Sequence, residues 1–92
     1  MNTILISYDL NGHEESPAYK KLIDRIKEYP TWAKPLESFW VVKTKSTATG
    51  VRDTLKTLID DNDELLTIDV TSRDWASRGL STKVTDWLKT NM

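Results

Sequence analysis

Apolar residues follow a strand-like pattern in four stretches of the chain. Residues 3–10 and 37–45 are dense in β-branched and aromatic residues, and residues 64–71 alternate between two sets of side chains. Patterns of this kind predict strands. Residues 32–36 predict a short edge strand, because Pro35 lacks the N–H group that a central strand donates to its ladder.

Helical patterns lie between these strands and after the last one. Ser16 predicts an N-cap, and Pro17 the first position, of a helix that ends before Pro30. Apolar residues at helical spacing predict a second helix over about residues 49–60. Ser81 predicts the cap of a short final helix.

The order of these elements predicts an α+β fold, a ferredoxin-like β-α-β-β-α-β sandwich with a C-terminal helix. Residues 1–71 form the expected core, and residues 72–92 form a C-terminal loop and helix that pack on the same domain. Right-handed crossovers place both crossover helices on one sheet face. The expected helix-covered face carries Ile4, Ile6, Tyr8, Leu66, Ile68 and Val70. The expected open face carries Leu5, Ser7, Asp9, Leu65 and Thr67.

Composition narrows the chemistry that this fold can carry. The 92 residues amount to one domain, with 13 basic and 14 acidic side chains and a net charge of −1. The absence of cysteine excludes disulfides, thiolate catalysis and Cys-based zinc sites, and the single His13 excludes a histidine-clustered metal site within one chain. Carboxylate and metal chemistry therefore remain the main catalytic option. The net charge argues against a protein that wraps nucleic acid by bulk charge alone.

The sequence also bears on location. No run approaches the roughly 20 apolar residues of a membrane span. The N-terminus has no basic region and meets an acidic residue at Asp9, unlike a signal peptide. We therefore expect a cytoplasmic protein without a membrane partner.

Asp9 is the strongest candidate for chemistry. A carboxylate at the carboxyl end of a central strand can hold Mg²⁺, which needs few protein ligands when phosphate oxygens complete its shell. A two-fold dimer would bring two Asp9 side chains together. The alternative is that Asp9 caps the following turn or simply ends the strand. His13, four residues later, could act as a general base or be an inert loop residue.

Strand direction limits which residues can join Asp9. We expect Asp69 to share the open face with Asp9 but to lie at the opposite edge of the sheet, because the first and last strands run antiparallel. The end of the strand over residues 37–45, around Thr44, Lys45 and Ser46, is expected to lie nearer to Asp9.

Short motifs along residues 1–71 resemble one family. Tyr8-Asp9-Leu10 is similar to the triplet that ends the first strand of the small CRISPR-associated spacer-acquisition subunit, an endoribonuclease-like family. Ser38-Phe39-Trp40-Val41-Val42 resembles its Ser followed by an aromatic, β-branched strand. A helix with Leu55, Leu58 and Ile59, and then an acidic turn, precede the last strand in the same order. The virulence-associated toxin ribonucleases resemble the same family.

The resemblance implies a homodimer formed through the sheet faces and a Mg²⁺-dependent endonuclease acting on RNA or DNA. Asp9 falls on the family's metal-binding, catalytic Asp, with Tyr8, Ser38 and Phe39 in support. The segment after Asp9 is acidic rather than Arg-rich, and a C-terminal helix replaces the strand that pairs with a partner, which favours a diverged standalone member. The competing hypothesis is a non-catalytic dimeric adaptor that binds a protein partner through the open face.

Several basic residues are candidates for phosphate contacts: Lys20, Lys21, Arg25, Lys45, Arg73 and Arg78. Interspersed acids favour the alternative of a solvated helix face. Trp75 lies between Arg73 and Arg78, a pattern that can stack bases, although a core role for this Trp is the alternative. An RNA-recognition module is excluded, because no glycine lies between Gly12 and Gly50 to form its strand motif.

Overall fold

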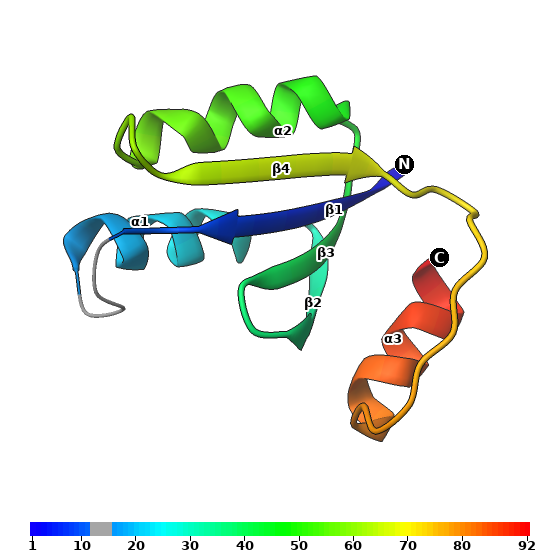
Figure 1. The fold of residues 1–92 in the computed structure, drawn as a ribbon. Helices are drawn as coiled ribbons and strands as arrows, with labels where there is room; N and C mark the ends of the chain where they lie inside the picture. The colour runs from blue at the N-terminus through cyan, green and yellow to red at the C-terminus, as the bar shows by residue number, and fades with distance from the viewer. Residues whose placement is uncertain (12–15) are drawn as a thin grey trace.

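A computed structural model describes residues 1–11 and 16–92. Over these residues the chain forms an α+β fold with a four-stranded antiparallel sheet and three α-helices (Figure 1). The elements in order are β1 (Asn2–Asp9), α1 (Pro17–Ile26), β2 (Thr31–Leu36), β3 (Phe39–Thr44), α2 (Ala48–Leu55), the 3-10 turn η1 (Lys56–Leu58), β4 (Glu64–Asp69) and α3 (Thr82–Asn91). His13, the candidate base, lies outside the described residues.

The strands lie in the order β2-β3-β1-β4, and every neighbouring pair is antiparallel. Ile6 in the middle of β1 lies opposite Trp40 on one side and Thr67 on the other. The two edges of the sheet are therefore β2 and β4, and β1 with its Asp9 terminus is a central strand, as the sequence predicts.

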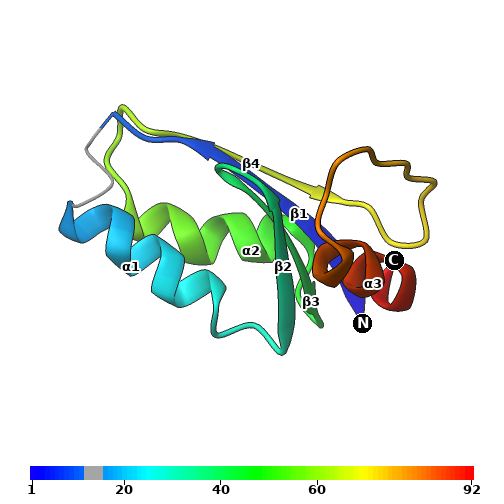
Figure 2. The same cartoon turned by 90° about the horizontal axis from the view of Figure 1, so that it is seen from below.

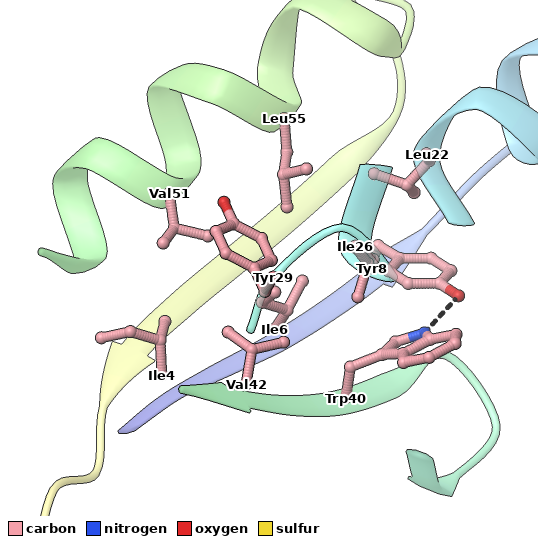
Figure 3. Packing of buried hydrophobic residues seen from close by; sticks show 10 residues of the cluster. All are labelled: Ile4, Ile6, Tyr8, Leu22, Ile26, Tyr29, Trp40, Val42, Val51 and Leu55. Carbon is pink, nitrogen blue, oxygen red and sulfur yellow. Dashed lines mark hydrogen bonds between the residues drawn. The ribbon is translucent and has the colours of Figure 1, made fainter. Parts of the chain in front are cut away.

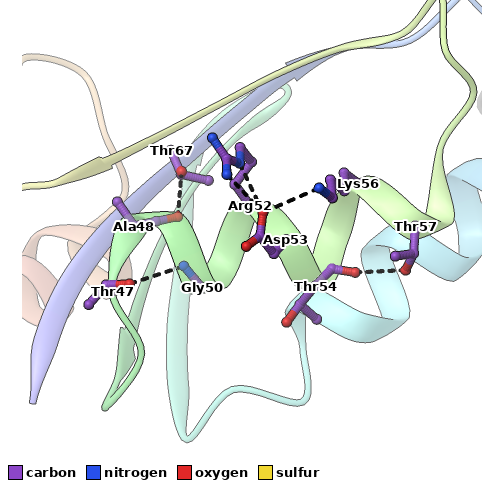
Figure 4. Close-up of polar contacts among 9 residues, drawn as sticks. All are labelled: Thr47, Ala48, Gly50, Arg52, Asp53, Thr54, Lys56, Thr57 and Thr67. Carbon is purple, nitrogen blue, oxygen red and sulfur yellow. Dashed lines mark hydrogen bonds and ion pairs between the residues drawn. The ribbon is translucent and has the colours of Figure 1, made fainter.

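Each helix begins at the hydroxyl cap that the local sequence offers. The side chains of Ser16, Thr47 and Ser81 accept the backbone N–H three residues further on, at 3.2, 3.0 and 3.3 Å. Figure 4 shows the Thr47 cap at the start of α2. These caps satisfy donors that the first helical turn leaves unpaired, and they confirm the predicted helix starts at residues 16 and 81.

The main core fills the space between the sheet and the pair α1 and α2 (Figure 3). Ile4, Ile6, Leu22 and Leu55 are completely buried there. Trp40 Nε1 donates a hydrogen bond to Tyr8 Oη at 3.0 Å, so the largest side chain of this core has its polar atom satisfied.

The prediction of which β4 side chains face the helices is wrong, because the two faces of this strand are exchanged. Leu66 and Ile68, expected beneath the helices, are 55% and 43% exposed on the other face, and Val70 lines a cavity there. Leu65 packs against the main core instead, and Thr67 Oγ1 donates to the Ala48 carbonyl of α2 at 2.8 Å (Figure 4). The reason is the register, since directly opposite residues share a face and Leu65 and Thr67 lie opposite Tyr8 and Ile6.

The C-terminal segment covers part of the face that α1 and α2 leave open. Figure 2 shows α3 on the opposite side of the sheet from these two helices. Leu88 is buried, Trp87 Nε1 donates to Thr31 Oγ1 at 2.8 Å, and Thr3 Oγ1 donates to the Asn91 carbonyl at 3.0 Å. An apolar cavity of about 290 Å³ remains between the sheet and this segment, and its walls include Leu5, Phe39, Val41, Trp75 and Leu88.

None of the helices in the described part of the chain has the length and apolar character needed to cross a membrane.

Candidate metal-binding site at the end of β1

Asp9 is the last residue of β1, and its side chain is exposed. Strand residues alternate between faces, so Asp9 points away from α1 and α2 while the preceding Tyr8 points into the main core. The register places Asp9 directly opposite Glu64, the first residue of β4. Side chains in such positions have Cβ atoms about 5 Å apart. Two exposed carboxylates therefore lie side by side on the open face.

A turn joins the beginning of β4 to the end of β1 and holds this pair in place. The Asp63 carboxylate accepts the backbone N–H of Asn11 at 2.9 Å and that of Asp60 at 2.8 Å. The Asn11 side-chain amide also donates to the Asn62 carbonyl. Asp63 is therefore a structural acid that anchors this turn to the end of β1.

The electrostatics of the Asp9–Glu64 pair are unfavourable without a cation. Like charges directly opposite each other destabilise an antiparallel pair. Within residues 1–11 and 16–92, neither carboxylate has a hydrogen-bond or ion-pair partner to offset the repulsion. A shallow depression of about 260 Å³ lies here, lined by Ser7, Tyr8, Asp9, Glu64, Leu65 and Leu66.

Two carboxylates suit a hard cation that fills most of its coordination shell with water or substrate oxygens. No group of three or more His, Cys, Asp or Glu side chains suited to a metal ion occurs among the described residues. Mg²⁺ is commonly bound by one or two carboxylates together with water and phosphate oxygens. Asp9 and Glu64 fit that requirement, whereas a zinc site would need more protein ligands.

The sequence pattern alone does not single out Glu64 as a site residue. Its partnership with Asp9 depends on the register of β1 and β4, which alternation alone does not define. A usable signal is present, however. If the first and last strands pair antiparallel, the end of the first lies beside the beginning of the last, and each of these positions carries an acid.

Of the three supporting residues, Tyr8 faces the main core. Its ring meets Tyr19 edge-on at 6.2 Å, and its hydroxyl accepts the Trp40 N–H. Tyr8 therefore anchors the end of β1 through contacts in the main core, on the face opposite to Asp9. The Ser38 carbonyl accepts the Tyr8 backbone N–H at 3.2 Å, and Phe39 lies opposite Ser7 on the open face.

Asp69 lies at the other end of the sheet from Asp9, as expected, because it pairs with Ile4. The expectation that it points to the open face is wrong, since Ile4 belongs to the main core and opposite residues share a face. The Thr71 hydroxyl and then the Thr71 backbone N–H donate to Asp69 Oδ1, at 2.5 and 2.9 Å, and lower the pKa of Asp69. Asp69 is thus engaged in a turn.

The expectation that residues 44–46 lie near Asp9 is wrong. β3 runs antiparallel to β1, so Thr44 pairs with Asn2 at the far end of β1. The residues of this hairpin that lie near the candidate site are Ser38 and Phe39, at the beginning of β3.

The six basic candidates are spread over separate parts of the molecule. Lys20, Lys21 and Arg25 are on α1, and Lys45 follows β3. Arg73 and Arg78 precede α3, and Arg73 lines the cavity on the face opposite to α1 and α2. Lys20 Nζ is 2.7 Å from an Asp24 carboxylate oxygen, and the Arg25 guanidinium lies 4.9 Å from the centre of the Tyr29 ring. The structure therefore does not bring these six residues together beside Asp9.

No known protein family model, curated protein or solved structure matches the chain.

Proposed function

We propose that this protein is a homodimeric, Mg²⁺-dependent nuclease that hydrolyses phosphodiester bonds in RNA or DNA, with Asp9 and Glu64 as metal ligands. The observation that carries the proposal is the exposed Asp9–Glu64 pair, which has no ion-pair partner among the described residues. The strand order β2-β3-β1-β4 supports a ferredoxin-like assignment, and with it the resemblance to the CRISPR-associated small subunit.

Each residue of the proposed site has a defined task. Asp9 and Glu64 would hold the Mg²⁺, and the chemistry that the ion would supply is Lewis-acid polarisation of a phosphate oxygen. Both side chains are exposed, so the site would lie on a surface that a nucleic-acid strand can reach. Since both carboxylates come from one chain, the site needs no second Asp9 from a partner.

A non-catalytic adaptor is the second candidate function. It is favoured by Leu66 and Ile68, which are large, apolar and 55% and 43% exposed on the same face as the acidic pair. Exposed apolar patches mark protein interaction sites, whereas nucleic-acid interfaces are more polar and more positively charged. In that case the open face binds a protein and the acidic pair has no catalytic task.

The cleavage test uses purified protein with single- and double-stranded RNA and DNA, in Mg²⁺ or in EDTA. We expect Mg²⁺-dependent cleavage that Asp9→Asn and Glu64→Gln each reduce by at least about tenfold. Asp86→Asn, which removes an exposed charge from α3, is the matched control and should cleave like the wild type. Cleavage that persists in both site variants overturns the assignment of Asp9 and Glu64.

A second measurement reads the metal site without activity. Mg²⁺ should raise the Tm of the wild type by binding the folded state, and each site variant should lose that rise. In EDTA, both variants should be at least as stable as the wild type, because each removes the repulsion between the carboxylates. A rise in Tm with Mg²⁺ that is equal in wild type and variants contradicts the site. If the protein neither cleaves nor binds nucleic acid at low salt, the adaptor function remains.

A further inference from the structure

We propose that β4 pairs antiparallel with β4 of a second copy of this chain, in a register centred on Thr67. The proposal starts from the position of β4 at an edge of the sheet, with β1 as its one strand neighbour among the described residues (Figure 1). It rests on the homodimer of the proposed function but not on its cleavage chemistry.

The two edges of the sheet differ in how they resist further pairing. β2 carries Lys34 and Pro35, and its pairing with β3 shifts register between Ala33 and Leu36. A lysine, a proline and an irregularity are the usual means by which an edge strand blocks another strand. β4, with the sequence Glu-Leu-Leu-Thr-Ile-Asp, has none of these and pairs regularly over its whole length.

The backbone groups of β4 that face outward can be assigned from two hydrogen bonds. The Thr3 carbonyl accepts the Val70 N–H at 2.8 Å, so Thr3 faces β4, whereas the Tyr8 N–H donates to Ser38 on the β3 side. Backbone groups alternate sides along an antiparallel strand, so Leu5 and Ser7 also face β4. Their partners Ile68 and Leu66 then face inward.

The alternate residues Leu65, Thr67 and Asp69 consequently present their N–H and C=O groups to the open edge. In a register centred on Thr67, the two copies of Thr67 exchange both hydrogen bonds, and Leu65 pairs with Asp69 of the other chain. Every outward N–H group of β4 then lies opposite an outward C=O group of the other chain. A pairing offset by one residue would place outward-facing residues opposite inward-facing ones, and these hydrogen bonds could not form.

The same register matches the side chains. It places Leu66 opposite Ile68 of the other chain twice, related by the two-fold axis, on the face where both are exposed. Opposite apolar side chains stabilise an antiparallel pair, most of all at positions between the hydrogen-bonded pairs, where the side chains are closer. Glu64 and Asp69 never lie opposite an acid in this register, so the acidic ends of β4 do not repel directly.

The pairing would extend the two sheets into one, with both open faces on the same side. The two Glu64 residues would then be six positions apart in the register, about 20 Å at the rise of a strand. Each Asp9–Glu64 pair would stay exposed and belong to a single protomer. The part of the open face that α3 covers would take no part in the interface, so α3 can remain in place.

The first test is the oligomeric state by sedimentation equilibrium, over protein concentrations up to about 100 µM, because a short two-strand interface is a small one. We expect wild type to dimerise and Ile68→Lys to raise the dimer dissociation constant at least about tenfold, because it replaces both Leu66–Ile68 apolar contacts and puts a lysine, the residue that most often protects an edge strand, on β4. Leu36→Lys places the same charge at an exposed apolar residue of the other edge strand and should dimerise like the wild type.

The second test measures the register of the β4 pairing by disulfide crosslinking. The chain has no cysteine of its own, so every disulfide must come from the introduced residues. Chains with Leu66→Cys and chains with Ile68→Cys are mixed and mildly oxidised. The mixture should form inter-chain disulfides several-fold faster than either variant alone, because residue 66 lies opposite 68 and only diagonal to 66. Circular dichroism spectra equal to that of the wild type would show that each variant is folded.

The outcomes separate this inference from the proposed function. A monomeric wild type, a dimer that Ile68→Lys leaves intact, or equal crosslinking in the mixture and the single variants would each overturn β4 pairing. Mg²⁺-dependent cleavage by a monomer would leave the metal site standing without this dimer. A dimer that crosslinks as expected but never cleaves would retain β4 pairing and remove the nuclease.

Discussion

Asp69 stabilises the end of β4 through its ionised form. The two hydrogen bonds from Thr71 lower its pKa, with a smaller contribution from the charge of Arg73. The folded state therefore favours the carboxylate more than the unfolded state does. This stabilisation is present above the unfolded pKa of about 4 and is lost as pH falls through the lower, folded pKa.

Replacing Asp69 should therefore change how stability depends on pH. We expect Asp69→Asn to lower the free energy of unfolding at pH 7, and to lose less stability than the wild type as pH falls below about 4. Urea unfolding at a series of pH values measures both effects. Asp61→Asn removes the same charge from an exposed turn position and is the control. Equal pH dependence in wild type and Asp69→Asn would contradict the role of this carboxylate.

At the scale of single residues, the sequence predicts half of the candidate site. Asp9 stands out because it ends a strand, which is a local property of the chain. Glu64 becomes its neighbour through the pairing of two strands that are separated by more than fifty residues. Local pattern carries no information on such a pairing until the strand order and register are known. The period of a strand, also a local property, predicts that Tyr8 lies on the face opposite to Asp9, and the structure confirms this.

Among elements, α2 and the turn before α3 each contain a glycine with a different backbone requirement. Gly50 lies in the first turn of α2, where an added Cβ would meet Ser46 and Thr47 at an ordinary 3.5 Å. Gly79 has a φ of +83°, a conformation that residues with a side chain rarely adopt, although nothing lies within 4 Å of its added Cβ.

Alanine at these two positions should shift stability in opposite directions. We expect Gly50→Ala to raise the free energy of unfolding by about 0.5–1 kcal/mol, because it removes the entropy cost of a helical glycine. Gly79→Ala should lower the free energy of unfolding by about 1–2 kcal/mol through backbone strain. Urea unfolding with an unchanged slope measures both. A stabilising Gly79→Ala would show that the turn relaxes to a negative φ.

β4 shows why an element can be predicted while its orientation is missed. Strand propensity and the preceding turn predict a strand over residues 64–71, and the observed strand is Glu64–Asp69. Its two faces carry Leu65 with Thr67 and Leu66 with Ile68, so they are almost equally apolar. Alternation of apolar and polar residues therefore does not show which face is buried. The register, in which Leu65 pairs with the core residue Tyr8, determines it. The exposed apolar face that results is also the basis for the proposed pairing of β4.

The whole molecule is a sheet with a different cover on each face. α1 and α2 cover one face over the main core, and the C-terminal segment covers part of the other (Figure 2). The sequence predicts that residues 72–92 pack on the domain, but not which face they take. The strands carry buried apolar side chains on both faces. Val42 is buried in the main core, whereas Val41 and Ala33 are buried on the other face, and α3 covers them there.

Because both layers share the same strands, α3 should unfold together with the main core. Leu88 is the buried residue of α3, and we expect Leu88→Ala to lower the free energy of unfolding by about 2–4 kcal/mol. The loss should appear equally in tryptophan fluorescence, which includes Trp87 on α3, and in far-ultraviolet circular dichroism, with one common transition. Lys89→Ala, at an exposed neighbouring position, should stay within about 0.5 kcal/mol of wild type. If Leu88→Ala shifts the fluorescence transition alone, α3 unfolds independently and the open face of the sheet is accessible in the otherwise folded protein.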